Sequence, residues 1–185
     1  MGLQPDQSQV IAGPGLIYLA PLGTALPTLT GAAPVWGAGW YQAGYTDAGI
    51  DAIYTPTIKE IYVDEQAAPV LDILEKEKFV VQAHLAEANL VNLQSAISAS
   101  TLTTSPLQIQ GGSDPLVYTM VGVQGPAPNG NIRVILMQKA ITTVAVSMKI
   151  TRKDKVVFPV SWDARQISGT WLFQITDCGT GYENS

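Results

Sequence analysis

The chain has 185 residues, a formal net charge of −5, 46% hydrophobic residues and only 14% charged residues. An ordinary soluble domain has about 25% charged residues. The composition therefore indicates that other subunits cover much of the surface, the alternative being a weakly charged surface that faces water. The acidic balance argues against nucleic acid as a tightly held ligand, which needs a basic patch. The single cysteine, Cys178, excludes a disulfide within the chain.

Residues 7–46 contain no Asp, Glu, Lys, Arg or His. Within this stretch, residues 16–20 are predicted to be a strand and residues 21–39 an extended loop, because turn-forming residues recur throughout it. A membrane-spanning helix is excluded because prolines interrupt the stretch every six or seven residues, at Pro14, Pro21, Pro27 and Pro34. The N-terminus lacks the positively charged segment of a signal peptide, so we expect synthesis in the cytoplasm of the cell that makes the protein.

The next segments are predicted to be strands around a hairpin. Residues 40–45 and 50–55 flank a predicted turn at 46–49, in which Gly49 suits a positive φ. Residues 57–64 alternate as a strand does, which places one set of side chains on one face and the other set on the opposite face. The first set is Ile58, Glu60 and Tyr62, and the second is Lys59, Ile61 and Val63.

Residues 65–78 are predicted to be a loop, with a short helix as the alternative, because they contain Pro69 and the mixed run Glu75-Lys76-Glu77-Lys78. A loop of this length within a compact domain is usually functional or disordered. We therefore expect residues 55–78 to form an extended loop or arm that contacts an adjacent subunit.

One helix is predicted, after a strand at residues 79–86. Leu90, Leu93 and Ile97 are spaced to form one apolar helix face. Asn89 is a suitable N-cap, and the residues from 98 to 105 cannot extend the helix, which is expected to be about ten residues long.

The remainder of the chain is predicted to be strands joined by turns. Asn129-Gly130 marks a tight connection, and a charged hairpin tip is expected at residues 152–155. The predicted strands are residues 116–122, 132–140, 143–151, 156–163 and 170–176. With terminal extensions at 1–14 and 177–185, the whole chain is predicted to be one domain, mainly β, an antiparallel sandwich or barrel with one flanking α-helix.

The sequence shows no constellation typical of catalysis. His84 is the only histidine and has no cysteine near it in the sequence, so we expect no metal site. Cys178 and the serines have no evident base to activate them. Asp64 and Glu65 are adjacent, so on a strand they would point to opposite faces and make a poor acid–base pair. We therefore expect a protein that is not an enzyme and that has no cofactor.

Several segments together resemble the major tail tube proteins of long-tailed bacteriophages, especially those of Gram-positive hosts. In chain order they are GPGLIYLAPLGT, a tryptophan-containing loop before GYTDAG, IKEIYVDEQ followed by APV, LAE leading into an Asn-Leu helix, and FPVSW followed by GTWLFQI. One departure is the segment HLAEAN, where the family pattern would have Thr or Ser before the helix.

The resemblance implies a structural virion protein that forms stacked hexameric rings, whose inner sheets join into a continuous barrel through which DNA passes during ejection. The implied partners are other copies of the chain and the tape measure, tail terminator and tip proteins of the same virion. DNA would be in transit only, with no membrane partner, and the protein would be located in the virion tail.

The residues themselves suggest where such contacts lie. Interface cores are depleted in charge and enriched in aromatic residues, so we expect Trp36, Trp40, Tyr41 and Tyr62 at subunit interfaces. The alternative is that the uncharged stretch covers its own barrel. A channel for DNA should avoid net positive charge, and the candidates for lining it are Asp51, Glu60 and Asp64.

Two other functions fit the same pattern. In a carbohydrate-binding β-sandwich module, Trp36, Trp40, Tyr41 and Tyr45 would stack on sugar rings. Another virion component, such as a tail terminator or a capsid decoration protein, would share the fold but would not polymerise into a tube.

Overall fold

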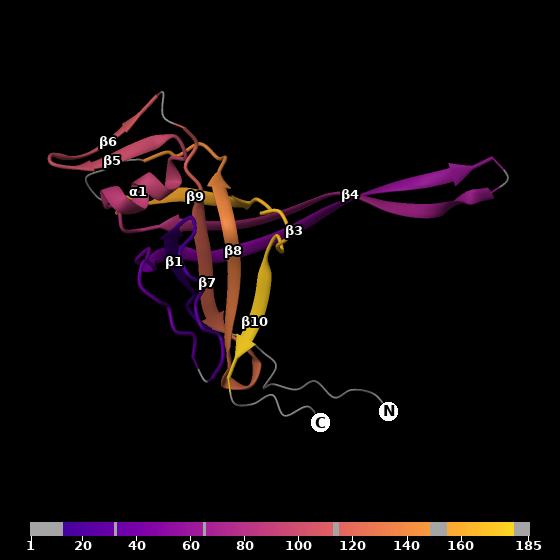
Figure 1. Ribbon diagram of the computed structural model, residues 1–185, viewed down its shortest axis with the longest axis horizontal. Coiled ribbons are helices and arrows are strands. Elements are labelled where there is room, and N and C mark those ends of the chain that lie inside the picture. The colour runs from indigo at the N-terminus through magenta and orange to yellow at the C-terminus, as the bar shows by residue number, and fades with distance from the viewer. Residues whose placement is uncertain (1–12, 32, 65, 113–114, 149–154, 180–185) are drawn as a thin grey trace.

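The computed structural model describes residues 13–31, 33–64, 66–112, 115–148 and 155–179. Within them, the strands are antiparallel and accompany one α-helix and one 3₁₀ turn (Figure 1). The strands are β1 (Leu16–Pro21), β2 (Tyr41–Gln42), β3 (Thr46–Val63), β4 (Gln66–Leu85), β5 (Ser100–Thr104), β6 (Leu107–Gly111), β7 (Thr119–Pro126), β8 (Ile132–Thr142), β9 (Phe158–Ala164) and β10 (Gln174–Cys178). The helix is α1 (Leu90–Ala96), and the 3₁₀ turn is η2 (Pro128–Gly130).

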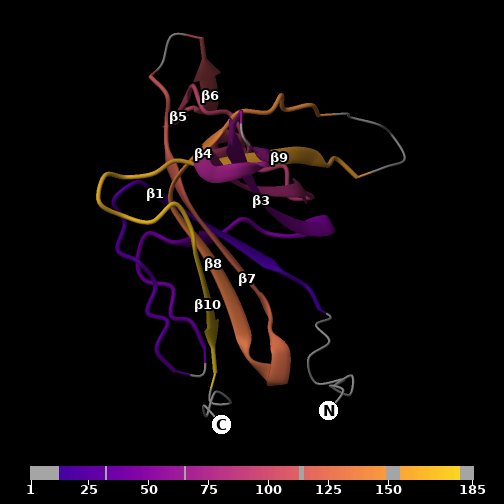
Figure 2. The same ribbon diagram turned by 90° about the vertical axis from the view of Figure 1, so that its right-hand side faces the viewer.

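Most strands belong to one sheet with the order β2-β1-β7-β8-β9-β4-β3, and β10 pairs with β8 beside this path. Figure 2 shows β7, β8 and β10 running along the long direction of the body, with β3, β4 and β9 crossing above them. The main core lies between these two parts of the sheet. It includes Leu19 of β1, Val121 of β7, Val81 of β4 and the fully buried Trp162 of β9. The prediction of a mainly β, antiparallel fold with one flanking helix is confirmed.

A second, smaller core lies on the other side of β8. Side chains of β8 alternate, so Ile135 and Met137 contact the main core while Val134 and Leu136 face outward. The uncharged segment 22–40 covers that outward side together with Trp171 and Cys178. A long loop without a charge is therefore a covering layer for the chain's own sheet.

The helix is attached by hydrogen bonds as well as by packing. Asn89 caps its N-terminus as predicted, since the Asn89 side chain accepts a hydrogen bond from the Asn92 backbone N–H at 2.8 Å. The buried Asn92 side chain donates to the carbonyl of Ala43 at 2.8 Å and to that of Glu87 at 3.1 Å. The Trp162 indole N–H donates to the Ser95 carbonyl at 3.3 Å.

The predicted hairpin turn at 46–49 is wrong. These residues begin β3, and the register with β4 passes from the Asp47–His84 pair directly to the Ile50–Ala83 pair. Ala48 and Gly49 are therefore two extra residues of a bulge, and both have a positive φ, of 65° and 90°. Gly49 does adopt the predicted backbone, but it serves a bulge because β2 pairs with β1 instead of β3.

Three further predictions of local structure need correction. The described residues 66–78 of the predicted loop 65–78 are strand, because β4 begins at Gln66 and pairs with β3 along its length. Residues 143–148 are not a strand, and β9 pairs with β4 and β8 instead. The Ser/Thr-rich residues after the helix do not extend it, as predicted, and they belong to the β5–β6 hairpin. Cys178 does not belong to the terminal extension predicted at 177–185 but is the buried last residue of β10.

Other predictions fall partly or wholly outside the described residues. The terminal extensions at 1–14 and 177–185 lie mostly there, and so does the charged tip at 152–155, of which only Lys155 is described. Its ammonium forms an ion pair with Asp47 at 2.8 Å.

Candidate subunit interface

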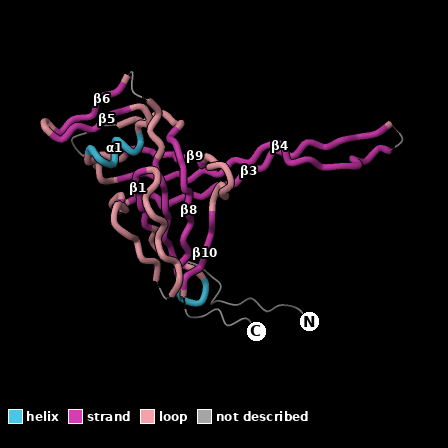
Figure 3. The backbone as a smooth tube through the Cα atoms, viewed as in Figure 1, coloured by secondary structure: helices cyan, strands magenta, loops and turns pink. Residues whose placement is uncertain are grey.

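The β3–β4 hairpin extends beyond the body as a narrow two-stranded ribbon (Figures 1 and 3). We call residues 55–78 the arm. The two strands pair in antiparallel register within it, from Thr55 opposite Lys78 to Ile61 opposite Leu71. In the described part of the chain no third strand pairs with the arm, since β9 contacts β4 only from Val80 to Leu85. The arm is thus open to solvent on both sides.

The base of the arm is held firmly on both sides. On one side the Phe173 ring stacks on Phe79 with 4.1 Å between ring centroids and contacts Tyr54 at 5.6 Å. On the other side the Lys78 ammonium lies 3.4 Å from a carboxylate oxygen of Asp163. The Asp163 carboxylate also accepts a hydrogen bond from the Thr143 hydroxyl at 3.1 Å. The direction in which the arm leaves the body is therefore fixed by packing and by an ion pair.

Beyond this base the arm exposes large apolar side chains. Ile58 is 58% exposed, Leu74, its cross-strand partner, is 52% exposed, and Tyr62 is 56% exposed. The remaining exposed apolar residues of the arm are Val63, Val70, Leu71 and Ile73. An isolated two-stranded hairpin is only marginally stable in water, and contiguous exposed apolar surface marks an interaction site. The arm is the candidate functional site of this chain.

Register assigns each side chain to one side of the ribbon. Residues directly opposite one another share a side, and successive residues alternate except at Glu75, an extra residue of β4 that has no partner on β3. One side continues the core side of β4 and carries Ile58, Glu60, Leu74, Asp72 and Glu77. The other continues the outer side of β4 and carries Lys59, Ile61, Leu71, Ile73, Lys76 and Lys78. These pairs confirm the predicted alternation for residues 57–61, whereas the register is irregular between Ile61 and Val63 and Asp64 lies in the turn.

Tyr62, one of the predicted interface residues, is on the arm. Its hydroxyl donates a hydrogen bond to the Glu60 carboxylate. That hydrogen bond, with smaller effects of desolvation and of the nearby Asp72 charge, raises the pKa of Tyr62. The interaction keeps the Tyr62 ring against the same side of the ribbon as Glu60.

The other aromatic candidates pack within the chain. The Trp36 ring stacks on Tyr18 at 4.1 Å with an interplanar angle of 11°, and its indole N–H donates to the Gln124 side chain at 2.8 Å. The Trp40 indole N–H donates to the Ala25 carbonyl at 2.8 Å. Trp36 also contacts Trp40 at 4.9 Å. Since Tyr18 covers one ring face of Trp36, that face is unavailable for sugar stacking.

Tyr41 packs against the main core from β2. Burial raises its pKa from 10.0 to about 12, because the phenolate form would lose its hydration. In this structure Trp36, Trp40 and Tyr41 cover the chain's own sheet, as the alternative in the sequence analysis states. Their contact with another subunit stays a prediction.

The three lumen candidates do not lie together. Asp51 is on β3 opposite Gln82, on the outer side of the sheet. Glu60 is separated from Asp51 by an odd number of residues along β3 and so lies on the other side of the ribbon, within the arm. Asp64 is an exposed turn residue at the tip of the hairpin. The sequence alone could not show that these residues lie on different sides, because tertiary packing decides which set of alternating β3 side chains faces the core.

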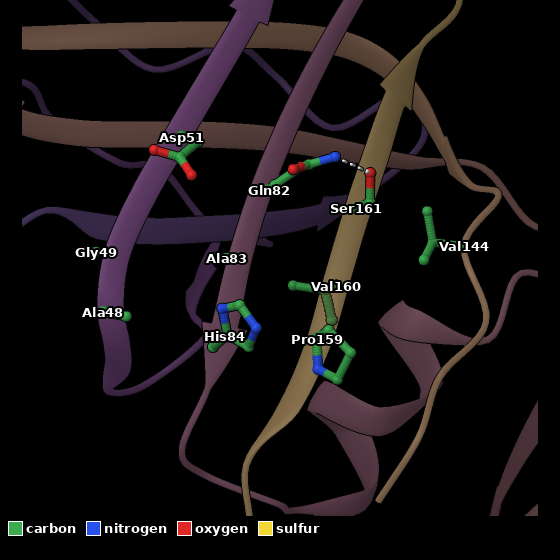
Figure 4. Close-up of a pocket in the computed structure, with 10 residues that line it drawn as sticks. All are labelled: Ala48, Gly49, Asp51, Gln82, Ala83, His84, Val144, Pro159, Val160 and Ser161. Carbon is green, nitrogen blue, oxygen red and sulfur yellow. Dashed lines mark hydrogen bonds between the residues drawn. The ribbon is translucent and has the colours of Figure 1, made fainter.

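A shallow pocket lies beside Asp51 (Figure 4). Cross-strand register places Asp51, Gln82 and Ser161 in one row and His84 with Pro159 in the next. Gln82 hydrogen-bonds Ser161 at 3.5 Å, and among the described residues no hydrogen bond joins His84 to Ser161 or to Asp51. The pocket therefore holds the residue types of a hydrolytic triad without the nucleophile–base contact that such a triad needs.

Two searches of the described residues give negative results. No three His, Cys, Asp or Glu side chains there lie close enough to hold a metal ion. Nor does any helix in those ranges have the length and apolar character to cross a bilayer.

Comparison with protein families identifies the family of this chain. Residues 1–177 match the model of a family described as phage tail tube protein. The chain belongs to this family. Tail tube proteins are structural components of the phage tail, and this places the chain among virion proteins of the tail. A comparison with curated proteins finds no match.

Membership in the family indicates which molecules are available to cover the exposed sides of the arm. A tail tube is built from many copies of its protein, so a surface that is apolar on both sides of a ribbon has copies of the same chain available to cover it. The signal in the sequence was the alternation of residues 57–64, which predicted a strand. The mixed charges of Glu75-Lys76-Glu77-Lys78 concealed its partner strand.

Proposed function

We propose that this chain polymerises as stacked hexameric rings into the tube of a long phage tail, which conducts DNA during ejection. The observation that carries the proposal is the arm, a firmly anchored ribbon with exposed apolar residues on both sides. Hexameric symmetry and ring stacking are what the resemblance to long-tailed phages implies. The remaining partners would be the tape measure, terminator and tip proteins of the same tail.

The sheet edges support assembly. β3 is an edge strand of the main sheet, so its outer backbone N–H and C=O groups lack a strand partner within the described chain. Natural proteins protect or cover long edge strands because these pair readily with other chains. Pairing of β3 with a neighbouring copy would extend the sheet around a ring and use this edge.

The outer side of β3, β4 and β9 is suited to face DNA in transit. It carries the polar residues Asp51, Gln82 and Ser161. On this side, Lys155 in the body is paired with Asp47 and Lys78 at the base of the arm is paired with Asp163, whereas Lys59 and Lys76 lie further out on the arm. A wall whose cations are neutralised offers few attachment points for phosphates. We propose that Asp51 lines the channel and that Asp64 contributes at the tip of the arm, whereas Glu60 lies on the opposite side of the ribbon and is not retained as a lumen residue.

The test is assembly of the purified protein. Negative-stain electron microscopy should show rings or tubes, and sedimentation velocity should show species far larger than a monomer. A matched variant replaces residues 56–77 by Asn-Gly, which joins Thr55 to Lys78 through a two-residue hairpin turn. This variant should keep the Phe79–Phe173 contact, melt like the wild type and remain monomeric.

A wild-type protein that remains strictly monomeric at high concentration would overturn the proposed function. Normal tubes from the variant without its arm would show instead that the tube forms and the arm is not its interface.

A further inference from the structure

The charged residues of the arm that have a cross-strand partner are segregated by side. The three acidic ones lie on one side, which we call the acidic side: Glu60, Asp72 and Glu77. All three lysines lie on the other, which we call the basic side: Lys59, Lys76 and Lys78. The alternating run Lys76-Glu77-Lys78 produces this separation because successive strand residues point to opposite sides.

Within the described part of one chain, most charges on the two sides of the arm have no oppositely charged partner. Glu60 lies directly opposite Asp72, and like charges in that arrangement destabilise a hairpin. Across the described residues, no ion pair within 4.0 Å reaches Glu60, Asp72, Lys59 or Lys76. Lys78 differs because it sits at the base, where it reaches Asp163.

Apolar residues lie beside the charges on both sides. The acidic side includes Ile58 and Leu74, and the basic side includes Ile61, Leu71 and Ile73. Each side therefore has an apolar surface with charges of one sign around it, which is the arrangement of an interface with a hydrophobic centre and a charged rim.

We propose that the basic side of one arm packs on the acidic side of the arm of an adjacent copy. This inference rests on the proposed function and names the partner surface of the arm. A contact between two different sides of the same element is heterologous. Each copy uses its basic side to bind one neighbour and its acidic side to bind the other, so the contact can repeat around a closed ring. One repeating contact then covers both sides of every arm and sets Lys59 and Lys76 against Glu60 and Asp72.

The experiment reverses one side at a time. The first variant, Glu60→Lys with Asp72→Lys, makes both sides basic, and the second, Lys59→Glu with Lys76→Glu, makes both sides acidic. Each variant alone should need a concentration about tenfold or more higher to polymerise, since exposed ion pairs become repulsive contacts. An equimolar mixture of the two should form tubes as the wild type does, because basic and acidic arms can alternate.

A third variant carries all four substitutions and exchanges the two sides. It should polymerise at the wild-type concentration, since every arm-to-arm contact is again between opposite charges. The control keeps each charge, with Lys59→Arg, Lys76→Arg and Glu60→Asp, and should also polymerise normally. Raising the salt from 0.1 M to 1 M shortens the screening length from about 10 Å to about 3 Å and should reduce the defect of each single-side variant.

The outcomes separate the two proposals. Wild-type tubes with no rescue by the mixture or by the fourfold variant would overturn the arm-to-arm contact and leave the proposed function standing. Single-side variants that polymerise as readily as the wild type would do the same. A wild type that forms neither rings nor tubes would overturn the proposed function and this contact with it.

Discussion

The uncharged segment 22–40 and the arm both lie outside the main core, yet they satisfy their apolar side chains differently. In the segment, Trp36 and Trp40 contact each other, and both indole N–H groups have acceptors within the chain. In the arm, Ile58 and Leu74 face each other across two strands and remain more than half exposed. The segment is a layer over its own sheet, whereas the arm has no such layer beneath it.

This difference shows that an apolar composition does not by itself make a segment of the chain a subunit interface. Aromatic residues in an uncharged stretch find partners wherever a sheet surface is near, and the outer side of β8 provides one. The arm carries more charge, but its length takes it away from the body, so nothing in the described chain covers it. Distance from the core distinguishes the two regions more reliably than charge content.

The largest effect is expected when the apolar centre of the arm is removed. Ile58→Ser with Leu74→Ser should abolish polymerisation at concentrations where the wild type forms tubes, because both residues would lose a buried contact with a neighbour. The melting temperature of the monomer should not change, since exposed substitutions usually alter stability by under about 0.5 kcal/mol. Electron microscopy and thermal denaturation measure the two quantities.

The matched variant in segment 22–40 is Trp36→Ala. It should lower the free energy of unfolding by about 3 kcal/mol, the low end for a tryptophan truncation because Trp36 is half-buried. A Trp36→Ala protein as stable as the wild type would remove the distinction between the two regions.

A smaller effect is expected where the uncharged segment approaches β7. A Cβ atom added at Gly122 would lie 2.4 Å from the Cη2 atom of Trp36, whereas one added at Gly125 of the same strand would meet nothing within 4 Å. Gly122→Ala should therefore lower the free energy of unfolding by about 1–3 kcal/mol through overpacking. Gly125→Ala is the control and should be nearly neutral. Equal unfolding curves for the two variants would mean that Trp36 does not rest on β7.

The last prediction concerns pH, and its effect is about 2 kcal/mol. Burial raises the pKa of Tyr41 from 10.0 to about 12, so the folded protein holds this proton more tightly than the unfolded chain does. The corresponding stability is complete below about pH 10 and is lost as the pH rises toward 12. Denaturant titrations across this range should show the loss in the wild type and a smaller one in Tyr41→Phe.

Tyr45→Phe is the control for this measurement, because the Tyr45 ring is 76% exposed. It should show the same loss as the wild type. If Tyr41→Phe also loses stability as steeply as the wild type, Tyr41 is not buried against the core.

Local patterns in the sequence determined much of the fold. An apolar run bounded by turn residues predicted β1, and alternating content predicted the core part of β4. The i, i+3, i+7 spacing predicted α1 and Asn89 its cap, but the helix is shorter than the expected ten residues because it ends at Ala96, with Ile97 as its C-cap. Asn129-Gly130 marked the tight connection before β8, and Asn129 does adopt a positive φ of 58°. Each of these features depends on interactions between residues close in the chain, which a single sequence records directly.

Tertiary structure alone decided the pairing of strands and the role of the arm. Thr46–Gly49 has the composition of a turn, but β3 pairs with β4 because Phe79 and Val81 must enter the core, and this makes Ala48 and Gly49 a bulge. The same register placed Asp51 and Glu60 on opposite sides and separated the lysines of the arm from its acids. A sequence specifies which residues alternate, but which of the two sides is buried depends on contacts with strands distant in the chain.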